Sequence, residues 1–284
     1  MPSADSKRRI RVGHSPDPDD AFMFYALTHD KIDTGSYEFV HQLEDIETLN
    51  RRALAGELEV SAVSVHAYAY LSEQYALLPN GASMGDRYGP MLVAKRRIAL
   101  AALPNMRIAV PGTLTSAFMA LQLWGGRGFQ YEVVPFDRII DEVVADRFDA
   151  GLIIHEGQLT YAQHGLHLVQ DFGVWWNDLT GLPLPLGCNI VRKDLGALAM
   201  KRIARLIYES IQYGLSHREE AIEYAMKYGR GIERNLADQF VGMYVNEWTR
   251  DYGPKGRQAV VEFLKAGYEA KILTKPAVVE FVEM

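Results

Sequence analysis

Residues 145–154 read Ala145-Asp-Arg-Phe-Asp-Ala-Gly-Leu-Ile-Ile154, and residues 55–64 read Ala55-Gly-Glu-Leu-Glu-Val-Ser-Ala-Val-Ser64. In both stretches a helix is predicted to end, a short acidic turn follows, and an apolar strand then leads into a helix with a histidine near its start. Two α/β lobes of similar build explain this repetition, and a cleft between two lobes is a common ligand site. Two unrelated strand–helix units have the same pattern, so the similarity alone does not establish a repeat.

Strands and helices alternate through the first two thirds of the chain. Strand, polar loop and helix follow one another at residues 9–27 and again at residues 107–124, and residues 66–75 are predicted to be helical. Asp45 and Asp137 stand at positions where each can cap a helix with an apolar face. This alternation predicts an α/β fold with mixed, mostly parallel sheets.

The length of 284 residues is about twice the commonest domain size and favours two lobes. Gly181-Leu-Pro-Leu-Pro-Leu-Gly187 is a rigid apolar segment that suits a return crossing between lobes. After this segment the chain reads as mostly helical. We therefore predict a discontinuous first lobe, residues 8–96 plus 188–284, and a second lobe, residues 97–187.

The composition excludes several classes of protein. Thirty Lys and Arg residues against 36 Asp and Glu give a net charge of −6, so no overall positive charge attracts nucleic acid or an anionic membrane. The single cysteine, Cys188, excludes an internal disulfide and a site built of several thiolates. The sequence shows neither a membrane span nor the apolar core of a secretory signal. We expect a cytoplasmic protein that binds neither nucleic acid nor membrane.

Polar side chains follow several predicted strands at the point where each strand ends. In open α/β sheets, ligands bind beyond the carboxyl ends of the strands, so these side chains are the candidates for a site. They are His14 and Ser15, Ser64 and His66, Thr113, Thr115 and Ser116, and His155 and Glu156. The pattern predicts a polar crevice without identifying a reaction.

His155 follows the apolar strand predicted at residues 150–154, which would hold its imidazole where a general base is useful near neutral pH. Glu156 is placed to orient the ring or to balance its charge. The alternative is a histidine at the start of a helix whose ring bonds to local backbone groups. The geometry of the site has to decide between the two.

Two loops leave alternatives of their own. Residues 111–116 present hydroxyls and N–H groups at a helix N-terminus, which suits a carboxylate or phosphate, although an ordinary Ser/Thr cap has the same sequence. Residues 14–20 cluster three carboxylates and an imidazole, as some metal sites do, but Pro16 and Pro18 hinder a multidentate wrap. We favour helix capping and a polar crevice wall there, and we predict no metal site.

Five blocks of the sequence carry a further signal. They are His14-Ser-Pro-Asp-Pro-Asp-Asp-Ala-Phe-Met-Phe-Tyr-Ala-Leu27, Tyr88-Gly-Pro-Met-Leu-Val93, Ala109-Val-Pro-Gly-Thr113, Gly151-Leu-Ile-Ile-His-Glu156 and Thr180-Gly-Leu-Pro-Leu-Pro-Leu-Gly187. Together they resemble the 1,4-dihydroxy-6-naphthoate synthases of the futalosine route to menaquinone. The last two blocks are the most specific, and the C-terminal third carries little signature. Relatives often have Cys-Pro-Asn-Asp where this chain has Asp17-Pro-Asp-Asp20.

The resemblance implies a fold like that of type II periplasmic binding proteins, with the substrate in a cleft between two α/β lobes. His155 then stands at the position of the family's proposed proton acceptor. The substrate contacts that we expect from the resemblance and from the strand ends are Ser15, Ala62, Val63, Ser64, Thr115, Ser116, Glu156, Pro185 and Leu186.

The implied reaction is a carbon–carbon lyase reaction that uses no cofactor. Cyclic dehypoxanthinylfutalosinate is converted to 1,4-dihydroxy-6-naphthoate with release of dihydroxyacetone, and deprotonation by His155 starts the cleavage. The expected partner is thus a small-molecule carboxylate, and the sequence does not predict an oligomeric state. Two alternatives remain open. A chorismate dehydratase of the same pathway and fold is not marked by a histidine in the Ile-Ile-His-Glu block, and a non-catalytic solute-binding protein would normally be exported.

Overall fold

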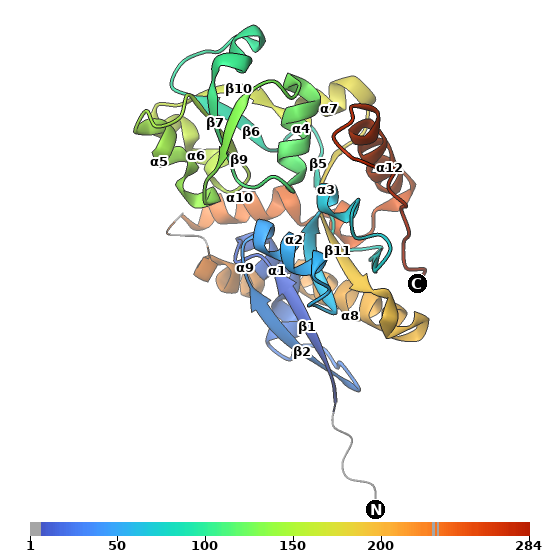
Figure 1. Cartoon of the computed structure of the whole chain (residues 1–284). Helices are drawn as coiled ribbons and strands as arrows, with labels where there is room; N and C mark the ends of the chain where they lie inside the picture. The colour runs from blue at the N-terminus through green and yellow to red at the C-terminus, as the bar shows by residue number, and fades with distance from the viewer. Residues whose placement is uncertain (1–6, 229–230, 232) are drawn as a thin grey trace, which may run out of the picture.

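The computed structural model describes residues 7–228, 231 and 233–284, so residues 229, 230 and 232 of the predicted first lobe lie outside the described residues. Within the described chain, two sheets form the centres of two lobes (Figure 1). The first sheet has the spatial order β2 (Tyr37–Leu43), β1 (Arg8–His14), β3 (Val60–Ser64), β11 (Leu184–Arg192) and β4 (Tyr75–Leu77), with β5 (Ser83–Gly85) also paired to β11. The second has the order β10 (His167–Asp171), β6 (Met91–Ala94), β9 (Ala150–Ile153), β7 (Arg107–Val110) and β8 (Gln130–Val133).

Parallel and antiparallel pairs occupy different parts of each sheet. Strand β1 runs parallel to β2 and β3, and β7 runs parallel to β8 and β9. Strands β11 and β6 run antiparallel to their neighbours. Each of these two strands enters its sheet after the chain has crossed from the other lobe, and not through the strand–helix–strand connection that produces a parallel pair. The sheets are therefore mixed, as predicted, but less parallel than predicted.

The described chain crosses between the sheets at residues 86–90, after β5, and again just before β11. The predicted division into residues 8–96 plus 188–284 and residues 97–187 stays a prediction. The strand pairing does not follow the predicted bounds at either crossing. Strand β6 falls in the predicted first lobe but pairs in the second sheet, and the start of β11 falls in the predicted second lobe but pairs in the first sheet.

Helices cover both faces of the first sheet. One face packs against α1 (Pro18–Thr28), α8 (Ala197–Ser216), α9 (Arg218–Ala225) and α10 (Arg234–Tyr244), whose buried side chains form one core with Val12, Val60 and Val191. Side chains alternate between the faces of a strand, and Val63 and Ile190 accordingly belong to a second core with α3 (Val65–Tyr68) and α12 (Gly253–Glu269). The helix α2 (Ile46–Leu54) packs on β3, and α11 (Glu247–Arg250) precedes α12.

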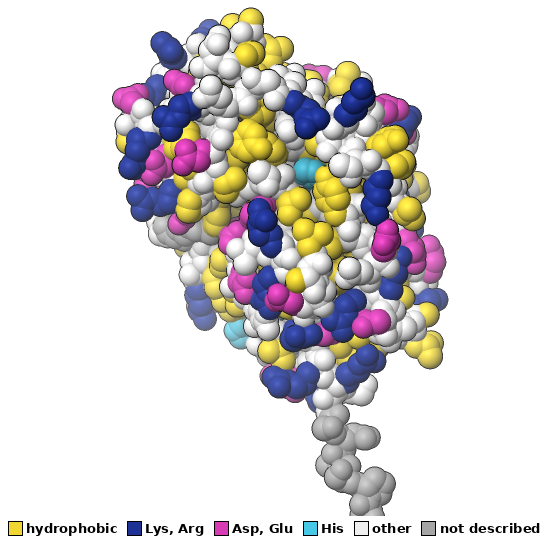
Figure 2. All heavy atoms as spheres, viewed as in Figure 1, with side chains coloured by type: hydrophobic (Ala, Val, Ile, Leu, Met, Phe, Trp, Pro, Cys, Tyr) yellow, Lys and Arg dark blue, Asp and Glu magenta, His cyan; other side chains and the backbone are white. Residues whose placement is uncertain are grey.

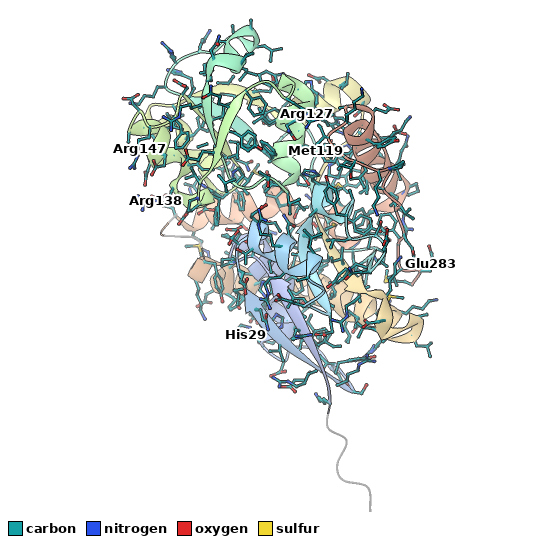
Figure 3. All side chains as sticks on the ribbon, viewed as in Figure 1. His29, Met119, Arg127, Arg138, Arg147 and Glu283 are labelled. Carbon is teal, nitrogen blue, oxygen red and sulfur yellow. The ribbon has the colours of Figure 1, made fainter. Side chains whose placement is uncertain are left out.

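The second core continues into the second lobe, whose helices include α4 (Ser116–Gly125), α5 (Ile139–Val144), α6 (Gly157–Thr160) and α7 (Phe172–Thr180). Figure 3 labels Met119 on the side of α4 that is toward α12. The Met119 sulfur lies 2.7 Å from the place that a Cβ on Gly267 of α12 would occupy. The last long helix of the chain therefore packs against both lobes.

Some of the predicted helix boundaries agree with the structure and others do not. Asp45 caps α2 as predicted, since its carboxylate accepts a hydrogen bond from Thr48 N–H at 3.1 Å. Asp137 does not cap a helix: it lies in a short 3₁₀ turn, and α5 begins only at Ile139. The predicted helix at residues 66–75 is correct only at its start, because α3 ends at Tyr68 and residues 75–77 form β4. Pairing with β11 outweighs the local helical pattern there.

No described helix is both long enough and apolar enough to span a membrane. On the face shown in Figure 2, basic and acidic side chains are interspersed. The predicted cytoplasmic location stays a prediction.

A buried and a half-buried histidine meet at the end of β1. His14 Nε2 lies 3.1 Å from His41 Nδ1, and the His14 ring stacks on Phe24 with centroids 4.6 Å apart. Burial and then the neighbouring His41 lower the pKa of His14 to about 3, and burial lowers the pKa of His41 to about 4. Both rings are therefore neutral in the folded protein at neutral pH.

This histidine pair predicts sensitivity to acid. The folded protein holds both pKa values below the ordinary 6.5, so the unfolded chain takes up protons first as the pH falls. The stability that this difference provides is complete above pH 6.5 and is lost as the pH falls toward 4 for His41 and toward 3 for His14. For His14 alone we expect the free energy of unfolding to fall by about 2 kcal/mol between pH 7 and pH 5. Urea unfolding at both pH values measures this, with His14→Gln as the comparison. The variant should change less with pH than the wild type, and an equal change would contradict the assignment.

Candidate active site

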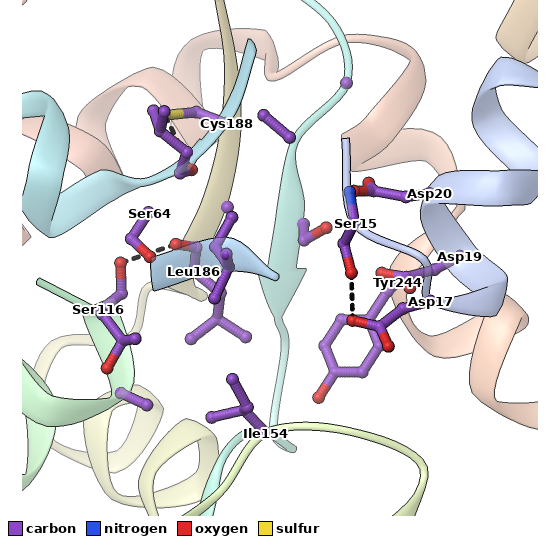
Figure 4. A pocket seen from close by; sticks show the side chains of 18 of the residues that line it. Ser15, Asp17, Asp19, Asp20, Ser64, Ser116, Ile154, Leu186, Cys188 and Tyr244 are labelled. Atoms are coloured by element: carbon purple, nitrogen blue, oxygen red, sulfur yellow. Dashed lines mark hydrogen bonds between the residues drawn. The ribbon is translucent and has the colours of Figure 1, made fainter. Parts of the chain in front are cut away.

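A cavity lies between the two lobes (Figure 4). The ends of β1 and β3 and the first turn of α1 line it from one lobe, and the start of α4 lines it from the other. Seven residues of the predicted site are among those that line it: Ser15, Ala62, Val63, Ser64, Thr115, Ser116 and Leu186. His155, Glu156 and Pro185 are not among the described residues that line it, although Ile154 and Leu186 beside them are. Which of these residues contact substrate stays a prediction.

Asn50 of α2 holds Ser64 at the end of β3. The amide oxygen of Asn50 accepts a hydrogen bond from Ser64 N–H at 2.8 Å, and its amide nitrogen donates to Ser64 Oγ at 3.2 Å. Asn50 itself is fully buried. Because Ser64 Oγ accepts a hydrogen bond from Asn50, its own hydrogen can be donated to an anionic group or a carbonyl in the cavity.

Asn50→Leu is expected to weaken both the fold and the site. The variant leaves the N–H of Ser64 buried without a partner, so the free energy of unfolding should fall by about 1–3 kcal/mol. The variant also frees the Ser64 hydroxyl to rotate, and because this hydroxyl is then no longer held toward the substrate, KM should rise severalfold. Urea unfolding and steady-state kinetics measure the two effects, with Asn105→Leu at an exposed position as the control. Wild-type stability in Asn50→Leu would show that the Asn50–Ser64 bonds contribute nothing.

Helix α4 presents its N-terminus to the cavity. Thr115 caps the helix, since its Oγ1 accepts a hydrogen bond from Phe118 N–H at 3.1 Å. The Ser116 hydroxyl donates to the Leu186 carbonyl at 2.6 Å, which joins α4 to β11. The first N–H groups of a helix have no partner within the helix, and Ser116 and Ala117 both line the cavity. The cap and a carboxylate site are therefore compatible here.

The wall opposite α4 is acidic. Figure 4 shows Asp17, Asp19 and Asp20, at the first turn of α1, across the cavity from Ser64. Asp20 accepts a hydrogen bond from Ser15 N–H at 2.6 Å, but burial raises the pKa of Asp20 to about 7. Burial and the neighbouring Asp20 and Asp17 raise the pKa of Asp19 well above its ordinary value. In their charged form these acids repel a ligand carboxylate, and only a protonated acid has a hydrogen that it can donate to one.

Both ring nitrogens of His155 bond to the backbone. Nε2 donates to the Phe136 carbonyl at 2.9 Å, and Nδ1 accepts from Gly157 N–H at 2.8 Å. Nδ1 also lies 3.9 Å from Glu156 Oε2. A Cβ at position 157 would come within 2.5 Å of the imidazole Cε1, so a glycine is required beside the ring. These bonds match the alternative of a helix-start histidine, and a role as base requires that one of them is exchanged.

The C-terminal helices supply lining residues that the sequence analysis missed. Phe240 and Tyr244 of α10 line the cavity, and the Tyr244 hydroxyl donates to Gln158 Oε1 of α6 at 2.8 Å. The two residues are one helical turn apart, a spacing that marks core positions as often as it marks a site. Because this bond joins α10 to the helix after His155, the two lobes are also tied together beside the candidate base.

Among the described residues, no group of three or more His, Cys, Asp or Glu side chains is arranged to hold a metal ion. Residues 14–20 instead supply the end of β1 and the first turn of α1. Cys188 lines the cavity but donates to the Val63 carbonyl at 3.6 Å, and burial raises the pKa of its thiol. This thiol is therefore in its neutral form, which is a poor nucleophile.

Comparisons with known proteins agree with this architecture. A family model described as menaquinone biosynthesis matches residues 10–269. A Thermus thermophilus protein named 1,4-dihydroxy-6-naphthoate synthase is 40% identical over 268 residues, which are 94% of this chain and 97% of the relative. The crystal structure of an Archaeoglobus fulgidus protein is 47% identical with a TM-score of 0.89, covering 93% of this chain and 98% of that one. A Candida albicans protein described as having the generic periplasmic binding protein fold is 14% identical with a TM-score of 0.70, covering 98% of each chain. The predicted fold class is thereby confirmed.

Proposed function

This chain belongs to the menaquinone biosynthesis family, and from that membership we propose that it is the lyase that converts cyclic dehypoxanthinylfutalosinate to 1,4-dihydroxy-6-naphthoate and dihydroxyacetone. Its place among the enzymes of menaquinone biosynthesis rests on the match over residues 10–269 and on the relative named for this product. The specific reaction is supported chiefly by one observation. Ser64, the N-terminus of α4 and Ile154 all line the cavity between the lobes, and Ile154 directly precedes His155 in the chain.

The N-terminus of α4 suits the carboxylate of this substrate. The helix dipole and the N–H groups of Ser116 and Ala117 attract a negative charge, and the Ser64 hydroxyl has a hydrogen to donate. Such fixed donors also stabilise an oxyanion that develops as bonds break, without reorganising during the reaction. The proposed ligand is therefore a small-molecule carboxylate.

His155 is the proposed base. It takes a proton from the substrate, the carbon–carbon bond to the three-carbon fragment breaks, and the proton returns to an oxyanion of the product. This sequence is redox-neutral and uses neither oxidant nor cofactor. Formation of the aromatic naphthoate ring makes the cleavage favourable. An imidazole suits repeated proton transfer because it can both accept and donate a proton near neutral pH.

The described conformation requires one change before His155 can act. The lone pair of Nδ1 is used by Gly157 N–H, and Nε2 donates to Phe136. We infer that substrate binding shifts residues 155–158 so that one ring nitrogen faces the cavity, which Ile154 already lines. The Tyr244–Gln158 bond gives this segment a direct connection to the other lobe.

Two other functions fit the same fold. A chorismate dehydratase would use another substrate of the same pathway, and a solute-binding protein would need only the cavity. Incubation of the purified protein with cyclic dehypoxanthinylfutalosinate and, separately, with chorismate distinguishes them, followed by chromatography with absorbance detection. We expect naphthoate from the first substrate and unchanged chorismate. Consumption of chorismate, or tight binding without turnover, would replace the proposed function.

A further inference from the structure

Asn189 of β11 has a buried amide with no hydrogen-bond partner among the described residues. The residue is 1% exposed, and neither its Oδ1 nor its Nδ2 is bonded. Buried amides are paired in most proteins because an unpaired one loses its hydration without compensation. Asn189 also lines the cavity. Its amide is thus placed to bond to a molecule in the cavity, both as donor and as acceptor.

The strand register shows which side of the sheet this amide occupies. In the antiparallel β3–β11 ladder, Asn189 lies opposite Ala62, and Val191 lies opposite Val60. Opposite residues, and residues two apart on a strand, project from the same face. Val60 and Val191 pack in one core with the buried side chains of α1. Asn189 therefore projects from the face that α1 covers, and the first turn of α1 is the acidic wall of the cavity.

Gly81 leaves the space that this amide fills. Its φ is +78°, and a Cβ there would lie 2.0 Å from Asn189 Nδ2. Gly81 lines the same cavity. The amide is thus fixed in position by a neighbour that supplies no hydrogen bond to it, as expected for a group that is kept for a ligand.

The two sides of the cavity suit different parts of a ligand. The donors at α4 suit a carboxylate, as argued above. The carboxyl groups of Asp19 and Asp20 can accept hydrogen bonds from hydroxyl groups in either protonation state, and in their charged form they repel an anion. An amide with a free donor and a free acceptor also suits a hydroxyl group, which needs both. Asn189 and the acidic turn therefore share a preference for hydroxyls.

We propose that Asn189 and the acidic first turn of α1 form a subsite for the hydroxyl-bearing part of the ligand, while the ligand's carboxylate lies at the N-terminus of α4. The inference rests on the proposed function, in which the three-carbon part leaves as dihydroxyacetone and the carboxylate stays on the naphthoate. The subsite then recognises a part of the substrate that this product lacks. It also holds the leaving fragment in position while the carbon–carbon bond breaks.

Asn189→Leu and Asp19→Asn test this subsite, with Asn105→Leu and Asp178→Asn at exposed positions as matched controls. Each site variant should raise KM for the substrate by about tenfold. The inhibition constant of added 1,4-dihydroxy-6-naphthoate should change by less than about twofold, because the naphthoate lacks the three-carbon part. Both controls should match the wild type in both constants. A site variant that weakens substrate and naphthoate equally would overturn the subsite.

Measuring the binding of dihydroxyacetone alone tests the subsite independently of the proposed reaction. A wild type that makes no naphthoate contradicts the function, whereas calorimetric titration with dihydroxyacetone tests the subsite in either case. We expect about tenfold weaker binding to Asn189→Leu than to the wild type, and equal binding would overturn the inference. Circular dichroism checks that the variants fold. Asn189→Ser keeps a donor and an acceptor and should bind with intermediate affinity.

Discussion

Replacing His155 with alanine is expected to lower kcat for naphthoate formation by roughly 10²- to 10⁴-fold, the range typical of a lost general base. The effect should fall on kcat and leave naphthoate binding nearly unchanged, because His155 is not among the described residues that line the cavity. Single-turnover measurements with saturating substrate check this directly. His164→Ala, an exposed histidine of the same lobe, should behave as the wild type.

A glutamine at position 155 separates the base from the structural alternative. Glutamine can still donate to the Phe136 carbonyl and accept from Gly157 N–H, the two bonds that His155 makes. It cannot take up a proton at neutral pH. We expect His155→Gln to fold as the wild type and to be as inactive as the alanine variant. Near-normal activity would mean that His155 only ties backbone groups together.

Gly173→Ala is expected to cause the largest loss of stability. Gly173 lies in the first turn of α7, and a Cβ there would lie 1.8 Å from the Tyr88 carbonyl oxygen. Tyr88 belongs to the crossing between β5 and β6, and that backbone has no flexible side chain that could yield. Overpacking usually costs about 1–3 kcal/mol, and a clash with backbone at a crossing should reach about 3 kcal/mol or more. The displaced crossing should also disturb the cavity between the lobes.

Urea unfolding measures this effect against Gly128→Ala. No atom lies within 4 Å of the place where a Cβ on Gly128 would be, so that variant should stay within about 0.5 kcal/mol of the wild type. Equal stability of the two variants would show that the crossing can move without cost. The account of a tightly packed connection between the lobes would then be wrong.

The fold was predictable wherever local pattern and tertiary pairing agree. Residues 107–110 form the predicted strand, and Asp45 caps the predicted helix, because apolar alternation and capping act over a few residues. The segment at residues 66–75 departs from its local pattern because β11, more than a hundred residues away, takes residues 75–77 as a strand partner. The sequence also predicted too large a share of parallel strand pairs, for a related reason. Residues 181–187 indicated a crossing between lobes, but no local signal indicates that β6 and β11 run antiparallel to their neighbours.

The candidate site was predictable to a similar degree. Ser15, Ser64 and Thr115 line the cavity because the ends of strands and the start of a helix can be located from sequence. Asn189 and Tyr244 could not be identified in this way. Asn189 stands inside a strand and owes its place to the β3–β11 register, and Tyr244 reaches the cavity only because α10 packs between the lobes. Such residues become visible only when the whole chain is folded.

The stoichiometry of the products tests the proposed lyase reaction most directly. Purified wild-type protein is incubated with cyclic dehypoxanthinylfutalosinate, and naphthoate and dihydroxyacetone are quantified over one time course. The account predicts that the two appear in equal amounts, at the same rate, as the substrate disappears. Loss of substrate without dihydroxyacetone, or a substrate that binds and is recovered unchanged, would contradict it.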